Sequence, residues 1–178
     1  TTAQTVHDWL RQHRFPSALF LEGAWDHPAD YESVACLSTT QYADLQAQFP
    51  HHTAMLARHA SMANGEWFVK YRQMQQAESD HLEAGLCEAL ARYDVYELPA
   101  DHHQRVMVQR WRQFATQAAS EERVYVFECC FLQNPLTTLL AKHDLPEPLV
   151  SCHMRMLAEI VAPLRPLVVY LAQHDVRA

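Results

Sequence analysis

The chain has 178 residues, of which 49% are hydrophobic and 20% charged, as expected for one globular domain. Its net charge of −7, with histidines counted neutral, provides no basic face and argues against nucleic acid as a partner. No apolar run reaches the about 20 residues of a membrane span, and we find no signal peptide, so we expect a cytoplasmic protein without a membrane partner. The 5 cysteines contain no CxxC pair, which fits free thiols in a reducing compartment.

The first half of the chain is predicted to be mostly helical. A helix is expected over 1–14, where Pro16 stops it, and a short strand over 17–23. A polar loop rich in acids follows over 24–31. Further helices, with Pro50 and Asn64-Gly65 as breaks, are expected over 41–48, 53–64 and 67–90.

In the second half of the chain, segments with the hydrophobic pattern of a helix alternate with segments that have the pattern of a strand. After an ambiguous segment at 93–99, helices are expected over 101–120, 137–143 and 150–161, and strands over 123–131 and 167–172. Such alternation implies a parallel sheet covered by helices. We therefore expect an α/β fold of three layers, with a parallel sheet of few strands flanked by helices, in one domain over 1–178.

Two of the expected strands end in a carboxylate. The first reads SALFLEG and delivers Glu22, and the second reads VYVFECC and delivers Glu128. Open α/β sheets build their sites where parallel strands end. We therefore predict that the two strands are adjacent and parallel and that both carboxylates are catalytic. The alternative is a salt bridge or helix cap for each.

The 12 histidines raise the question of a metal site. They are scattered, no HExxH motif occurs, and the doublets at 51–52 and 102–103 lie in polar stretches. We therefore interpret them as solvated surface side chains and predict no metal site. A histidine-based metal-binding protein remains an alternative.

Several segments together resemble a known family. They are TTAQTVHDWL, FLEGAWDHPADYE, WFVKYRQ, YELP and VFECCFLQNPLTTLL. With them, nearly the whole chain resembles a poorly characterised bacterial family of P-loop NTPases related to nucleoside and nucleotide kinases. The resemblance implies a preceding strand and a phosphate-binding loop, GxxxxGK[ST], and a continuation past Ala178, so the chain is expected to be a fragment of a P-loop kinase-like domain.

The resemblance implies ATP-dependent phosphoryl transfer to a small molecule, with a nucleoside-like acceptor as one candidate, in the complete protein. ATP and Mg²⁺ are the implied cofactors. Thr1 or Thr2 corresponds to the hydroxyl that follows the loop lysine and ligates Mg²⁺, and the alternative for either is a helix N-cap. A non-catalytic P-loop-derived module that binds a ligand or protein is the alternative function. The sequence leaves the oligomeric state open.

Other candidates for substrate binding surround the two strands. The acceptor is expected to contact Asp26, His27, Asp30 and Tyr31 in the loop after the first strand, unless that loop is a solvated turn. Lys70 and Arg72 are candidates for binding phosphate, with surface cations as the alternative. Gln133 and Asn134 follow the second strand and either position a substrate or brace the site.

Overall fold

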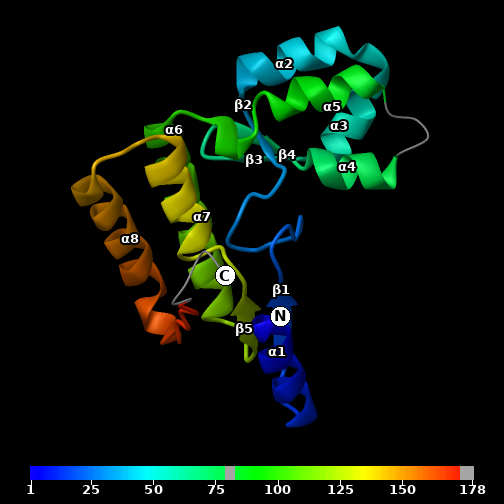
Figure 1. Cartoon of the computed structure of the whole chain (residues 1–178). Helices are drawn as coiled ribbons and strands as arrows, with labels where there is room; N and C mark the ends of the chain where they lie inside the picture. The colour runs from blue at the N-terminus through cyan, green and yellow to red at the C-terminus, as the bar shows by residue number, and fades with distance from the viewer. Residues whose placement is uncertain (79–82, 173–178) are drawn as a thin grey trace, which may run out of the picture.

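The computed structural model describes residues 1–78 and 83–172. In this part of the chain, helices lie beside two separate small sheets (Figure 1). The α/β class expected from the sequence is confirmed, and a parallel sheet is present. An antiparallel sheet, which the sequence did not predict, accompanies it. No helix of the described residues is both long and apolar enough to cross a membrane.

The parallel sheet consists of β1 (Ser17–Phe20) and β5 (Val124–Phe127). Ser17 pairs with Val124 and Phe20 with Phe127, so the predicted adjacent and parallel pairing is confirmed. The second strand is shorter than expected, because the chain turns away after Phe127. Helix α1 (Thr2–Gln12) packs on both strands, and the N-terminus lies beside β1 (Figure 1).

Two long helices, α6 (Ala100–Ala118) and α8 (Glu147–Val161), pack side by side near this sheet. Phe114 of α6 contacts the rings of Tyr125 and Phe127 at centroid distances of 5.1 and 5.0 Å. Aromatic side chains from β5 therefore fill the space under α6 and fix the position of the strand relative to the helix.

The antiparallel sheet has the order β2-β4-β3. Its strands are β2 (Ala35–Ser38), β3 (Ala60–Ala63) and β4 (Glu66–Val69). The turn between β3 and β4 is Asn64-Gly65, with φ values of 53° and 82°. Asn-Gly is among the strongest signals for a two-residue hairpin, because both positions require left-handed backbone.

This hairpin corrects two helix predictions. The helix expected over 53–64 ends at His59 as α3 (Thr53–His59), and that expected over 67–90 is replaced by β4, α4 (Tyr71–Ala77) and α5 (Ala84–Ala91). The apolar run at 67–69 is compatible with either period, and pairing with β2 and β3 makes it a strand. Residues 79–82 of that expected helix lie outside the described residues.

The remaining elements are short or well capped. Ser38 and Gln41 form a capping box at the start of α2 (Thr39–Gln48). The Gln133-Asn134 pair begins α7 (Gln133–Leu136), and a π-helical turn follows over Thr137–Lys142. Single 3-10 turns occur at Pro50–His52, Val95–Glu97 and Ala162–Leu164.

The strand expected over 167–172 is wrong. This segment has no regular structure, and its apolar side chains are exposed, up to 89% for Leu167. Its composition favours a strand, but it makes no strand pairing with the described residues, and an unpaired strand is not stable by itself.

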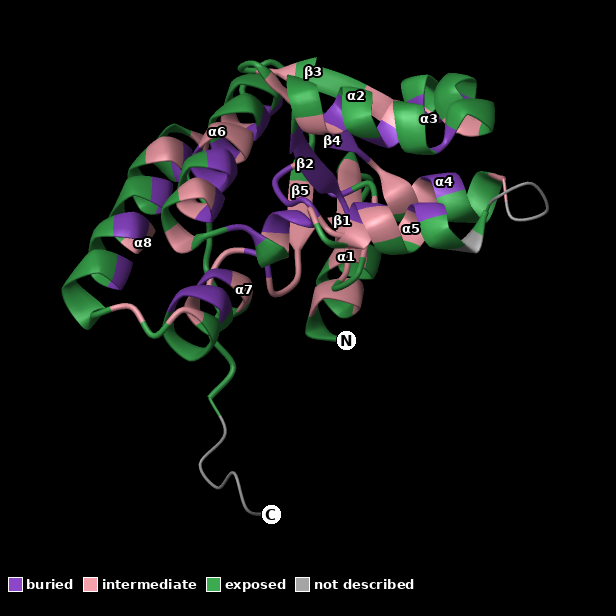
Figure 2. Cartoon of the chain, turned by 90° about the horizontal axis from the view of Figure 1, so that it is seen from above, coloured by how far each residue is buried: buried purple, intermediate pink, exposed green. Residues whose placement is uncertain are grey.

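Among the described residues, the buried hydrophobic residues form three clusters. Figure 2 marks the buried positions along the ribbon. The first lies between the antiparallel sheet and α2 to α5, around Leu37 and Leu56. The second lies between α6 and α8, around Trp111 and Leu157. The third, around Phe68 and Val106, connects the antiparallel sheet to α6.

Candidate functional site

Glu22 and Glu128 lie next to each other just beyond the C-terminal ends of β1 and β5. The backbone N–H of Glu22 donates to Oε2 of Glu128 over 3.4 Å. The backbone N–H of Glu128 in turn donates to the carbonyl of Phe20 over 3.1 Å, which extends the parallel pairing by one bond. Glu22 is exposed and Glu128 is half-buried. Two neighbouring carboxylates at a solvated edge are suitable ligands for Mg²⁺ or its bound waters.

Cys129 and Gln133 complete this group. The thiol of Cys129 donates to Glu22 Oε2 at 3.6 Å, and the Gln133 amide donates to Glu22 Oε1 at 3.5 Å. Burial, followed by the charge of Glu22, raises the pKa of Cys129 to about 11. The thiol is therefore a hydrogen-bond donor at neutral pH and no nucleophile. Gln133 thus contacts Glu22, and the choice between its two predicted roles stays a prediction.

The turn after β5 is conformationally unusual. Cys129 has a φ of 65°, in the left-handed region that a residue with a Cβ seldom adopts. This backbone turn ends the strand and brings Gln133 back toward Glu22. The backbone N–H of Asn134 donates to the carbonyl of Cys129 over 3.1 Å, which ties α7 to the same turn.

Asp30 and Asn134 lie together in a buried polar group. Asp30 is 5% exposed and accepts hydrogen bonds from the hydroxyl of Tyr96 at 2.7 Å and from the Asn134 amide at 3.0 Å. It also accepts from the backbone N–H of Tyr31 at 2.7 Å. Three donors stabilise the buried carboxylate, which links the loop after β1 to α7. Asp30 therefore shapes the loop from inside the protein.

His27 and Tyr31 are buried as well. His27 lies against the rings of Phe20 and Phe127, with centroid distances of 5.3 and 4.5 Å. Burial lowers its pKa to about 4. Tyr31 stacks on Phe68 at 4.8 Å, so the loop is a packed segment and the alternative of a solvated turn is wrong for these residues.

Arg110 supports this loop from α6. Its Nη2 donates to the carbonyl of His27 at 2.8 Å, and its guanidinium lies 4.8 Å from the ring centre of Tyr31. Its Nε is buried without a hydrogen-bond partner among the described residues. Burial lowers the pKa of Arg110, and the charge of Arg110 in turn contributes to the lowered pKa of Lys70.

Charged side chains border the loop on the side of the antiparallel sheet. Lys70 lies half-buried just before α4, where burial is the main cause of its lowered pKa. Arg72 is 3.9 Å from a carboxylate oxygen of Glu32, and both side chains are partly exposed. Burial raises the pKa of Glu32, and the charge of Glu22 contributes to the same shift. The charge of the exposed Asp26 partly opposes the lowering of the pKa of Lys70 that burial causes.

Thr1 caps α1. Its hydroxyl accepts from the backbone N–H of Gln4 at 3.3 Å, as the N-cap alternative predicted. Thr2 is the first residue of the helix.

Sequence reasoning missed Tyr96 and Arg110. Tyr96 lies in the YELP segment, which carries part of the family resemblance, and a buried Tyr needs a partner for its hydroxyl. Arg110 lies on the apolar side of α6, next to Trp111, and a cation there is a signal of an internal partner. The interpretation of the histidines as surface groups is wrong for His27, His103 and His153, which are at most 5% exposed.

Comparisons with protein-family models, with curated proteins and with solved structures find no significant match for this chain.

Proposed function

We propose that the edge formed by the ends of β1 and β5 is the reaction site of a P-loop kinase-like domain. The complete protein would transfer a phosphoryl group from ATP to a small molecule, with a nucleoside-like acceptor as the first candidate. The observation that carries this proposal is the parallel pairing that brings Glu22 and Glu128 together. Ligands of open α/β sheets bind at this end of the strands.

The two carboxylates would have different roles. Glu128 is half-buried and held by the strand end, so it is the candidate base that takes the proton of the acceptor hydroxyl. The hydroxyl oxygen would then attack the γ-phosphorus of ATP and ADP would leave. Glu22 is exposed and would orient the waters of Mg²⁺, with Gln133 fixing its carboxylate.

The remaining candidates supply charge and position. Lys70 and Arg110 are neighbouring cations, each disfavoured by burial, and an anionic group of a ligand would offset their mutual repulsion. Thr1 or Thr2 would follow a phosphate-binding loop, and β1 with β5 would belong to a larger three-layer parallel sheet. The cysteines are free thiols, which suits a cytoplasmic protein.

The test compares the chain 1–178 with the full product of its gene. Isothermal titration with Mg-ATP and a phosphoryl-transfer assay over nucleosides and nucleotides would be run on both. We expect ATP binding and turnover only in a product that carries GxxxxGK[ST] before Thr1, because the loop amides and lysine hold the phosphates.

Equal ATP affinity in both forms would show that the P-loop interpretation is wrong. Binding of a nucleoside or nucleotide without turnover in either form would favour the non-catalytic binding module.

A further inference from the structure

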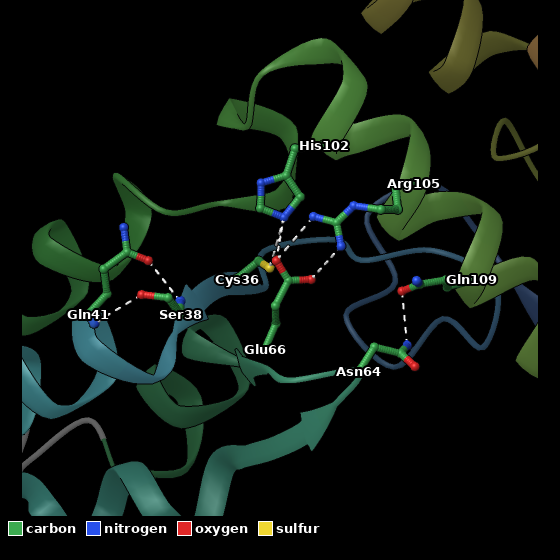
Figure 3. A network of polar contacts seen from close by, with 8 residues as sticks. All are labelled: Cys36, Ser38, Gln41, Asn64, Glu66, His102, Arg105 and Gln109. Carbon is green, nitrogen blue, oxygen red and sulfur yellow. Dashed lines mark hydrogen bonds and ion pairs between the residues drawn. The ribbon is translucent and has the colours of Figure 1, made fainter.

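Three side chains with metal-binding atoms meet at a second place, between the antiparallel sheet and α6 (Figure 3). Cys36 belongs to β2, Glu66 begins β4, and His102 lies in the first turn of α6. Nε2 of His102 is 2.6 Å from Glu66 Oε1 and 3.9 Å from the Cys36 sulfur. All three donor atoms lie within 4.8 Å of one another.

We propose that Cys36, Glu66 and His102 bind a divalent transition-metal ion of the Zn²⁺ type. A thiolate, an imidazole and a carboxylate form a mixed donor set that Zn²⁺ accepts and that Mg²⁺ and Ca²⁺ do not prefer. Three protein ligands leave the fourth tetrahedral position to water. The site is separate from Glu22 and Glu128 and does not depend on the function proposed for them.

The distances are close to those of a tetrahedral site. With metal–ligand bonds of about 2.0–2.3 Å, ligand atoms lie about 3.3–3.6 Å apart. The separation of 3.9 Å between Cys36 and His102 needs only a small adjustment. The hydrogen bond of 2.6 Å between His102 and Glu66 must open to admit an ion. Glu66 is the first residue of β4, and a rotation of its side chain would open this contact.

Arg105 holds the carboxylate of Glu66 from the outside. Its Nη1 is 3.2 Å from Oε2, and its Nη2 is 3.4 Å from Oε1. The arginine side chain is half exposed, so it can keep Oε2 while Oε1 turns to the ion. Outer groups that hydrogen-bond a ligating carboxylate orient it and are a usual part of metal sites.

Cys36 is the least accessible of the three donors. It is 3% exposed, it packs in the cluster with Phe68 and Val106, and its backbone N–H donates to the carbonyl of Tyr93 at 2.8 Å. Burial raises the pKa of its thiol to about 12, so the thiol carries a proton when no ion is bound. Binding replaces this proton by the metal and releases it to solvent, and His102 coordinates through Nε2 with its own proton on Nδ1.

No sequence motif predicts this metal site. His102 is 66 residues from Cys36 and 36 residues from Glu66 along the chain, so the short ligand spacings typical of zinc motifs are absent. The ion would tie the antiparallel sheet to the start of α6. This assignment departs from the expectation that the histidines form no metal site.

The test uses the chain 1–178, made without an affinity tag and freed of metal with a chelator. Titration with Co²⁺ would be followed by absorbance, and Zn²⁺ by elemental analysis and thermal melting. We expect one ion per chain, a near-ultraviolet thiolate–Co²⁺ band that Zn²⁺ abolishes, and a melting temperature that rises with Zn²⁺.

Two variants and two matched controls define the ligands. Cys36→Ser and His102→Gln should weaken Zn²⁺ binding by more than the roughly 10–100-fold that loss of an outer-shell partner costs. Cys152→Ser and His51→Gln change an exposed thiol and an exposed imidazole elsewhere and should leave the affinity unchanged.

If a ligand variant does not fold, the proposal is tested in the unchanged chain by the protection of Cys36 from alkylation. Zn²⁺ should slow alkylation of Cys36, read by peptide mass spectrometry, without slowing that of Cys152. Absence of the thiolate band, equal Zn²⁺ affinity in Cys36→Ser and Cys152→Ser, or equal alkylation with and without Zn²⁺ would overturn the proposal. The three side chains would then be an ion-pair network only.

Discussion

The backbone N–H of Glu22 points at the carboxylate of Glu128, 3.4 Å away, although 106 residues separate the two in sequence. The parallel register of β1 and β5 produces this approach, since both strands end at the same edge. The two acids are held by different means. Glu128 follows its strand directly, while Glu22 is held by contacts from Cys129 and Gln133.

Replacing Glu128 by Gln tests the proposed base. In the gene product that shows turnover, Glu128→Gln should lower kcat by on the order of 10²-fold or more, the usual scale for an acid–base group. The melting temperature should change little, because the amide oxygen still accepts from the N–H of Glu22. Steady-state kinetics beside a thermal melt measure both effects.

Glu159→Gln is the matched control, because Glu159 is an exposed carboxylate on α8. It should leave both quantities unchanged. Normal turnover with a lowered melting temperature for Glu128→Gln would identify Glu128 as a structural cap instead.

Tyr96→Phe tests the buried group around Asp30. The substitution removes one of the two donors to Oδ1 of the buried Asp30 carboxylate, and this oxygen then keeps only the backbone N–H of Tyr31. We expect a loss of about 1–3 kcal/mol in the free energy of unfolding, measured by urea denaturation. Tyr170→Phe removes the same hydroxyl from a side chain that is 77% exposed and should cost nothing measurable. Equal effects of the two substitutions would contradict the stabilising role of Tyr96.

Two buried histidines predict acid sensitivity. Burial lowers the pKa values of His27 and His153 from 6.5 to about 4. Between these pH values the histidines are protonated in the unfolded chain and neutral in the folded chain. The free energy of unfolding therefore falls as the pH drops from about 6.5 to about 4. Each histidine contributes a slope of roughly 1.4 kcal/mol per pH unit in this window.

His153→Met keeps a buried side chain and removes one of these groups. Urea unfolding at several pH values should show a slope reduced by about one proton relative to the unchanged chain. His51→Gln, at an exposed position, should keep the full slope. An unchanged slope in His153→Met would mean that His153 is protonated in the folded protein near its ordinary pKa.

Helix α1 should exchange its amide hydrogens faster than α6. None of the residues of α1 is buried, whereas seven residues of α6 are. Few buried contacts mean a small free energy of local opening. Hydrogen–deuterium exchange read by mass spectrometry should show protection in α1 at least about 10-fold lower than in α6. Similar protection in the two helices would show that α1 is held by more than its contacts with β1 and β5.

The sequence predicted the parts of the fold that local signals specify. The pairing of β1 with β5 followed from two apolar runs that each end in an acid, and α6 and α8 followed from their apolar periodicity. The hairpin of β3 and β4 was missed although Asn64-Gly65 was noted, because the pair was interpreted as a helix break. Asn-Gly is itself a local hairpin signal, whereas the pairing of β4 with β2, which completes the sheet, is non-local.

Only the part of the candidate site that local sequence signals specify could be predicted. Glu22 and Glu128 could be found from strand ends, whereas the burial of His27 and Asp30 depends on side chains far away in sequence. The Phe127 ring and the Tyr96 hydroxyl provide those environments. The meeting of Cys36 with His102 likewise requires the packing of α6 on the antiparallel sheet.

The three buried clusters have a consequence for cooperativity. The cluster around Leu37 lies at the antiparallel sheet, and the cluster around Trp111 lies between α6 and α8. The third cluster, with Phe68 and Val106, is the apolar contact between these two halves. Unfolding of either half would expose this shared cluster, so the two halves should unfold together. Val106→Ala should weaken this coupling, and we expect scanning calorimetry to show a broader or split transition relative to the unchanged chain.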